Sequence, residues 1–210
     1  MKRLLMVSMA LAVSGCSWGD IQYSNDYQVL IDPTFDAEDQ TAIVNAIQSW
    51  EDISDKQFSF KLSIIQTGQC VGKPSIFDDP LQAGQICIRP ATVAFLIANG
   101  GEKSVTSDWI GVTYRNQYDN TSVIYIPLSR DTGYNLTSMT TIMGHELGHA
   151  LGCGHTTART SSIMFPVIAG QAALPTCNDL AQAMHVRGQS DVDQSCPAGG
   201  SYTLNGDGTY

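Results

Sequence analysis

The stretch that decides the fold is His145-Glu-Leu-Gly-His-Ala-Leu-Gly-Cys-Gly-His155, which places three histidines and one glutamate at fixed spacings. Residues four apart lie on one face of a helix, so His145 and His149 can offer ring nitrogens to one metal ion, with Glu146 beside them. His155 can supply a third nitrogen. The stretch therefore predicts a zinc site with three protein ligands and an open fourth position for water.

Gly152 explains how the third histidine can reach the same ion. A glycine can end a helix in a left-handed conformation, which lets the chain turn back and deliver His155. A structural zinc site would need a fourth protein ligand, usually a cysteine, and Cys153 is the only candidate nearby. It lies between Gly152 and His155, where a metal bond would compete with that of its neighbour. The pattern favours a catalytic site.

A methionine-containing segment, Ser162-Ile-Met164-Phe-Pro166, follows closely. The long zinc motif and this segment together resemble the metzincin metallopeptidases. Within that group, the motif and Met-x-Pro are most similar to the matrixins, the matrix-metalloproteinase-like proteins. The resemblance implies His145, His149 and His155 as ligands of one catalytic Zn²⁺, Glu146 as the general base that activates a zinc-bound water, and Met164 as the residue of the Met-turn.

The resemblance implies an α+β, metzincin-like zincin fold: a twisted, mostly parallel sheet with an active-site helix and a C-terminal helix. It covers roughly residues 26–188 as one catalytic domain, and the hydrophobic periodicity agrees. Asp36 with Asp39 can cap a helix whose Ile43, Ile47 and Trp50 form a core stripe. We expect strands over residues 27–31, 58–64, 109–114 and 121–127, and a C-terminal helix over 179–184 that stops near Gly188.

The N-terminus predicts export. Lys2 and Arg3 precede an apolar run over residues 4–13 that is too short to span a membrane, which predicts a signal peptide over residues 1–15. The run ends at Val-Ser-Gly-Cys16, which resembles the bacterial lipoprotein box, in which Cys16 becomes the lipid-modified first residue. Residues 16–25 would then tether the domain to the outer membrane or cell surface of a bacterial envelope. An ordinary secretory signal, giving a secreted protein, is the alternative.

Five cysteines remain after Cys16, in a chain expected where disulfides persist. Short separations in the sequence favour the disulfide pairs Cys70–Cys87 and Cys177–Cys196, which would leave Cys153 unpaired. A Cys153–Cys177 bridge is the alternative.

The net charge of the 210-residue chain is −9, and it becomes −11 without Lys2 and Arg3, which disfavours nucleic acid as a partner. Residues 189–210 form a polar, Gly-rich tail. Its Asn205-Gly-Asp207-Gly gives no clear motif for structural Ca²⁺. The oligomeric state is left open.

These patterns predict a zinc-dependent endopeptidase that hydrolyses peptide bonds of extracytoplasmic proteins. The resemblance implies that an extended protein or peptide substrate pairs with an edge strand near residues 123–126. We expect residues 167–174 to wall a specificity pocket. The alternative is a catalytically silent, zinc-containing surface lipoprotein that binds or adheres to a partner. His185, outside the motif, is expected on a helix surface without a role.

Overall fold

The computed structural model describes residues 25–65, 81–99, 111–116, 120–156, 162–165 and 174–185. The predicted signal peptide, Cys16, the tether up to residue 24, Gly188 and the tail over 189–210 lie outside these residues. The described elements are, in chain order, β1 (Asp26–Ile31), α1 (Ala37–Ile53), β2 (Ser59–Ile64), β3 (Gln85–Pro90), α2 (Val93–Asn99), β4 (Val112–Asn116), β5 (Thr121–Ile126), α3 (Ser129–Thr132), α4 (Leu136–Ala150) and α5 (Cys177–His185).

The five described strands form one sheet in the order β2-β1-β3-β5-β4. Strands β2, β1, β3 and β5 pair in parallel, and β4 pairs with β5 in the antiparallel direction. The expected mostly parallel sheet is confirmed. The prediction that substrate pairs near residues 123–126 is wrong in its choice of strand, because β5 lies between β3 and β4. Among the described strands, β4 forms the edge on that side.

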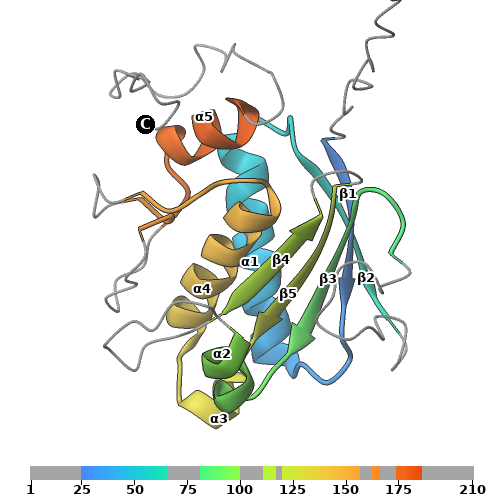
Figure 1. The fold of residues 1–210 in the computed structure, drawn as a ribbon, viewed down its shortest axis with the longest axis vertical. Coiled ribbons are helices and arrows are strands. Elements are labelled where there is room, and N and C mark those ends of the chain that lie inside the picture. The colour runs from blue at the N-terminus through green and yellow to red at the C-terminus, as the bar shows by residue number, and fades with distance from the viewer. Residues whose placement is uncertain are drawn as a thin grey trace, which may run out of the picture.

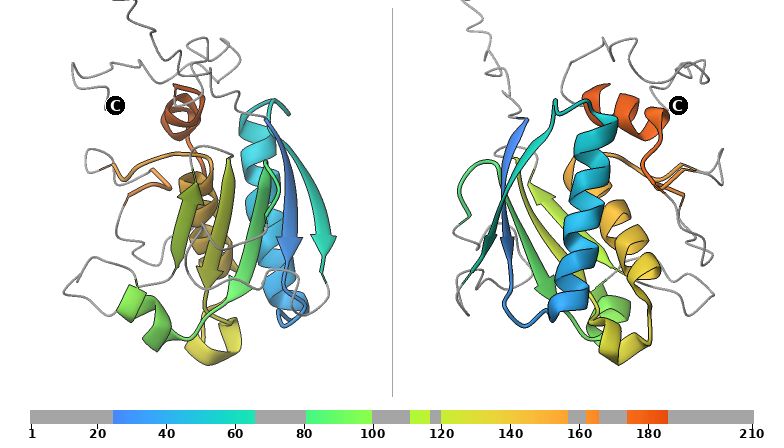
Figure 2. Two further views of the ribbon diagram at one scale, coloured as in Figure 1. Left: turned by 45° about the vertical axis from the view of Figure 1, so that its right-hand side comes forward. Right: turned by 180° about the vertical axis from the view of Figure 1, so that it is seen from behind.

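Two long helices cover one face of the sheet (Figures 1 and 2). α1 and α4 lie side by side, while α2 and α3 lie at one end of the sheet and α5 at the other (Figure 1). Asp36 is the N-cap of α1, and its side chain accepts hydrogen bonds from the backbone N–H groups of Glu38 and Asp39. The carboxylate of Asp39 accepts instead from the N–H of Ser129, at the start of α3.

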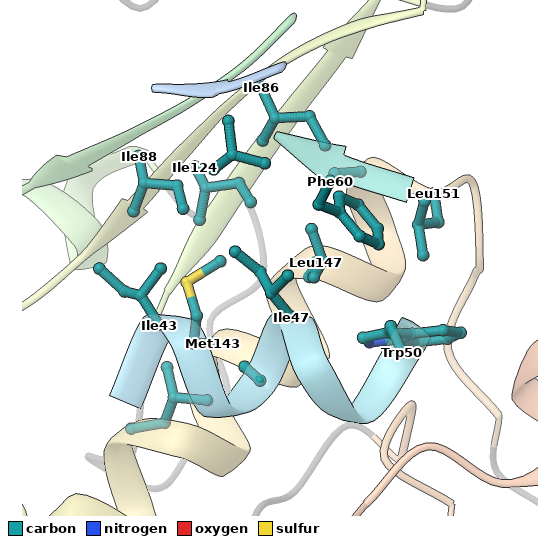
Figure 3. Packing of buried hydrophobic residues seen from close by; sticks show 14 of the residues in the cluster. Ile43, Ile47, Trp50, Phe60, Ile86, Ile88, Ile124, Met143, Leu147 and Leu151 are labelled. Carbon is teal, nitrogen blue, oxygen red and sulfur yellow. The ribbon is translucent and has the colours of Figure 1, made fainter. Parts of the chain in front are cut away.

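The main core fills the space between the sheet and these two helices (Figure 3). Ile86, Ile88 and Ile124 project from the strands toward α1 and α4, as period-two alternation requires. The predicted stripe on α1, which consists of Ile43, Ile47 and Trp50, is buried against them. Trp50 also donates a hydrogen bond from Nε1 to the backbone oxygen of Gly144, over 2.9 Å, which ties α1 to α4.

Three cysteines lie among the described residues. Cys87 and Cys177 are each disulfide-bonded. Cys70 and Cys196, which proximity pairs with them, lie outside the described residues, so these two pairings stay predictions. Cys153 is a buried thiol outside any disulfide, which excludes the alternative bridge to Cys177. Of the helices described, none has the length and apolar character needed to cross a membrane.

Candidate metal centre and catalytic glutamate

The helix that carries the motif begins and ends by local hydrogen bonding. Asn135 is the N-cap of α4, and its side chain accepts from the N–H of Ser138. At the other end Gly152 has a φ of 97°, the left-handed conformation expected from the sequence. The N–H of Gly152 donates to His149 O and that of Cys153 to Gly148 O, which together form a Schellman motif. The chain therefore reverses immediately before His155.

The structure brings His145, His149 and His155 together. Their Nε2 atoms lie 3.0, 3.1 and 3.2 Å apart in the three pairs. Zinc–nitrogen bonds of about 2.0–2.1 Å at tetrahedral angles place ligand nitrogens about 3.3–3.4 Å apart, so the cluster fits a zinc site. His145 is buried, His149 is half-buried and His155 is exposed. The cluster therefore opens toward solvent on the side of His155.

Backbone carbonyls orient two of the rings. His145 Nδ1 lies 2.6 Å from Ile163 O, and His149 Nδ1 lies 2.9 Å from Cys153 O. A carbonyl only accepts, so each Nδ1 carries the proton and each Nε2 keeps its lone pair for a metal. Burial lowers the pKa of His145 to about 3 and that of His149 to about 4, with further lowering from the neighbouring histidines. Both rings are therefore neutral at neutral pH.

Glu146, which directly follows His145 on α4, is almost fully buried, with 6% of its surface exposed. Thr113 of β4 donates from Oγ1 to Glu146 Oε2 over 2.7 Å. Burial raises the pKa of Glu146 to about 7, against the lowering effect of the Thr113 hydrogen bond. A carboxyl group with a pKa near neutrality suits a residue that takes up a proton and later returns it.

Met164 is fully buried against α4. A Cβ atom on Gly148 would collide with Met164 Sδ and would lie 3.1 Å from Trp50. The absence of a side chain at Gly148 thus lets the segment around Met164 and the Trp50 ring pack directly on α4. Thr156 N–H donates to Met164 O over 3.0 Å, which joins this segment to the loop of His155.

A buried carboxylate on α5 anchors the same segment. Asp179 Oδ1 accepts a short hydrogen bond from Ser162 Oγ, and Oδ2 accepts from the N–H and hydroxyl of Thr176, both over 2.7 Å. The N–H of Met164 in turn donates to Ser162 Oγ. Cys153 Sγ donates to Asp179 O over 3.4 Å. The C-terminal helix therefore holds both the Met164 segment and the end of the loop before His155.

Sequence reasoning missed several of these residues. The carbonyls of Cys153 and Ile163 act through the backbone, which leaves no mark in the residue type. Thr113 comes from a strand more than thirty positions before Glu146. Asp179 carried a weak signal as an acidic residue at the start of a helix. His185 is exposed on α5 and is absent from the histidine cluster. Residues 167–173 of the expected pocket wall lie outside the described residues, and Leu174 is exposed.

Comparison with known proteins agrees with this geometry. The family model described as matrixin, in the peptidase M10 group, matches residues 24–184. The match covers all ten described elements except the last residue of α5. No individual curated protein matches the chain.

Proposed function

Because this chain belongs to the matrixin family of zinc metallopeptidases, we propose that it is an endopeptidase that cleaves extended segments of extracytoplasmic proteins, with Glu146 as the general base. The observation that carries the proposal is the buried carboxyl group of Glu146, the residue that directly follows His145 on the helix whose histidine nitrogens converge with that of His155. Neither a structural metal site nor a binding surface requires a buried carboxyl group at that place.

In this proposal His145, His149 and His155 hold the zinc ion. When bound, zinc would polarise the scissile carbonyl and lower the pKa of the attacking water. Glu146 takes the proton of that water at its carboxylate and returns it to the leaving amine. Its burial supports this role, because burial disfavours the charged form of the carboxyl group and so favours the uptake of a proton.

Substrate binding is assigned to β4. An extended peptide can add a strand to an exposed sheet edge, with main-chain hydrogen bonds holding it straight. β4 is the edge strand next to α4, and Thr113 of β4 contacts Glu146. A peptide paired with β4 would therefore run past the carboxylate and the histidine cluster.

The proposed targets are extracytoplasmic because the sequence predicts export and a lipid anchor at Cys16. Cys87 and Cys177, which are disulfide-bonded, suit the oxidising surroundings outside the cytoplasm. The bacterial cell envelope is thus the proposed location.

Glu146→Ala tests the proposed reaction. The histidines that form the metal site remain, so zinc content and fold should match the wild type. General acid–base assistance is worth about 10²–10⁴-fold, and cleavage should fall by at least that factor. The measurement is cleavage of a denatured protein and a quenched peptide library, with zinc content determined on the same samples.

His185→Ala is the matched control, because it removes an exposed histidine of α5 that lies outside the cluster, and this variant should cleave as the wild type does. Undiminished cleavage by Glu146→Ala would remove Glu146 from the mechanism. Zinc-loaded wild type that cleaves nothing in a broad library would favour the binding or adhesion lipoprotein instead.

A further inference from the structure

One residue of β4, Thr113, and the residue just before this strand, Gly111, contact the carboxyl group of Glu146, and neither belongs to the histidine motif. Thr113 Oγ1 lies 2.7 Å from Glu146 Oε2 and 3.0 Å from the backbone oxygen of the same residue. Gly111 is buried immediately before β4. A Cβ atom on Gly111 would lie 2.6 Å from Glu146 Oε1 and 2.6 Å from its Cγ. Thr113 thus forms a hydrogen bond with the carboxylate, whereas the backbone of Gly111 packs closely against it.

The backbone geometry of β4 explains why Thr113 and Gly111, the residue before the strand, both contact Glu146. Residues two apart in a strand project to the same face, so positions 111 and 113 both face α4. Thr113 pairs with Ile124 of β5, whose side chain lies in the core between the sheet and the helices. The edge strand proposed to hold the substrate is therefore also the strand that contacts the proposed base.

We propose that Gly111 and Thr113 are positioning residues that fix the carboxylate of Glu146 for proton transfer. This inference rests on the proposed role of Glu146 as general base. Buried carboxyl side chains have several rotamers, and a reacting group must be held within about 0.5 Å of its productive position. The hydroxyl of Thr113 and the backbone of Gly111 both contact the Glu146 side chain and together restrict which rotamer it can adopt.

Thr113 has a property that a simple anchor lacks. Its hydroxyl carries one proton and has two acceptors within reach, Glu146 Oε2 and Glu146 O. When Glu146 is a carboxylate, the hydroxyl donates to Oε2. When Glu146 holds a proton on Oε2, the hydroxyl accepts that hydrogen bond and donates to the backbone oxygen. Thr113 therefore has a hydrogen bond for both forms of Glu146 without moving its oxygen.

Gly111 is required by space and not by backbone conformation. Its φ is outside the left-handed region, which is confined to Gly84, Gly133 and Gly152 among the described glycines. A methyl group would fit the backbone, but it would push the carboxyl group of Glu146 aside. Gly111→Ala should therefore act on Glu146 while leaving the three histidines in place.

The experiment compares Thr113→Val, which keeps the shape of the side chain but removes the hydroxyl, with Thr113→Ser, which keeps the hydroxyl. Loss of a residue that supports a catalytic group typically costs about 10–100-fold in activity. We expect Thr113→Val to lose this factor in kcat with KM and zinc content unchanged, and Thr113→Ser to remain near the wild type. Gly111→Ala should resemble Thr113→Val.

Crystal structures of the zinc-loaded variants give a second readout that does not depend on turnover. Glu146 should keep its conformation in Thr113→Ser and should move or split into several conformers in Thr113→Val and Gly111→Ala. An unmoved carboxylate in both of those variants, wild-type kcat in Thr113→Val, or equal losses in the Ser and Val variants would each overturn the inference. A wild type without peptidase activity would refute the proposed function instead, and the crystal structures would still decide the positioning.

Discussion

At the scale of single residues, His155 differs from the other two histidines in how it is held. His145 and His149 lie on α4 and their Nδ1 atoms bond to backbone carbonyls. His155 lies on the exposed loop that follows Gly152, and its position depends on the helix end and on the Thr156–Met164 hydrogen bond. His155 completes the three-histidine cluster, because α4 by itself supplies only two of its members.

His155→Ala should therefore weaken zinc binding without unfolding α4. Even residues that only orient a metal ligand change affinity by about 10–100-fold, so loss of a ligand should cost at least that much. Zinc affinity can be measured by competition with a chromophoric chelator, with His185→Ala as the control. Unchanged affinity in His155→Ala would limit the metal site to the two helical histidines and overturn the eleven-residue interpretation.

At the scale of elements, close packing against α4 explains why a glycine stands at position 148. Glycine in the middle of a helix normally costs about 1 kcal/mol relative to alanine, so Gly148 looks like a defect in isolation. In the fold, the missing side chain makes room for Met164 and Trp50. The tertiary contact therefore explains a residue that helix propensity disfavours.

Gly148→Ala should lower the free energy of unfolding, because overpacking a core costs about 1–3 kcal/mol and the gain in helix propensity is at most about 1 kcal/mol. Urea unfolding measures the change. Met164→Ala in the same chain should relieve part of the cost, so the double variant should lose less stability than the two single variants together. A more stable Gly148→Ala would show that the helix and the Met164 segment are not in direct contact.

Short elements without a strong period are those that the sequence does not predict. β3 alternates over only six residues and is buried on both faces at its centre, α2 is an apolar run of seven residues, and α3 has four residues. Their formation depends on the neighbours that they pack against. α3, for example, starts where Asp39 of α1 accepts from the N–H of Ser129.

At the scale of the whole molecule, the anchor at Cys16 stays a prediction from the sequence. Each acyl methylene buried in a membrane contributes about 0.8 kcal/mol, and two or more chains are needed for stable anchoring. The full chain should therefore partition into the detergent phase and incorporate labelled fatty acid, and Cys16→Ser should do neither. Ser17→Ala, which leaves the cysteine in place, should behave as the wild type. Equal, unlabelled recovery of both forms in the aqueous phase would favour ordinary secretion.

The sequence by itself determined the histidine cluster, because the cluster depends on local spacing. Through the resemblance that the motif carries, the sequence also indicated the family and, with it, the mostly parallel sheet. Helical periodicity places His145 and His149 on one face, and the left-handed Gly152 brings His155 back, all within eleven residues. The stripe on α1 and strands β1, β2 and β5 follow equally from short-range periodicity.

Only the tertiary structure decided which groups surround that cluster. The contacts of Glu146 with Gly111 and Thr113, and the choice of β4 instead of β5 as the edge strand, join segments that are far apart in the chain. Strand order and side-chain packing depend on how all the elements pack around one core, and no local sequence pattern specifies that packing. The sequence of α4 supplies two of the histidines and the glutamate, whereas the position of the Glu146 carboxylate depends on β4, which only the fold brings beside the helix.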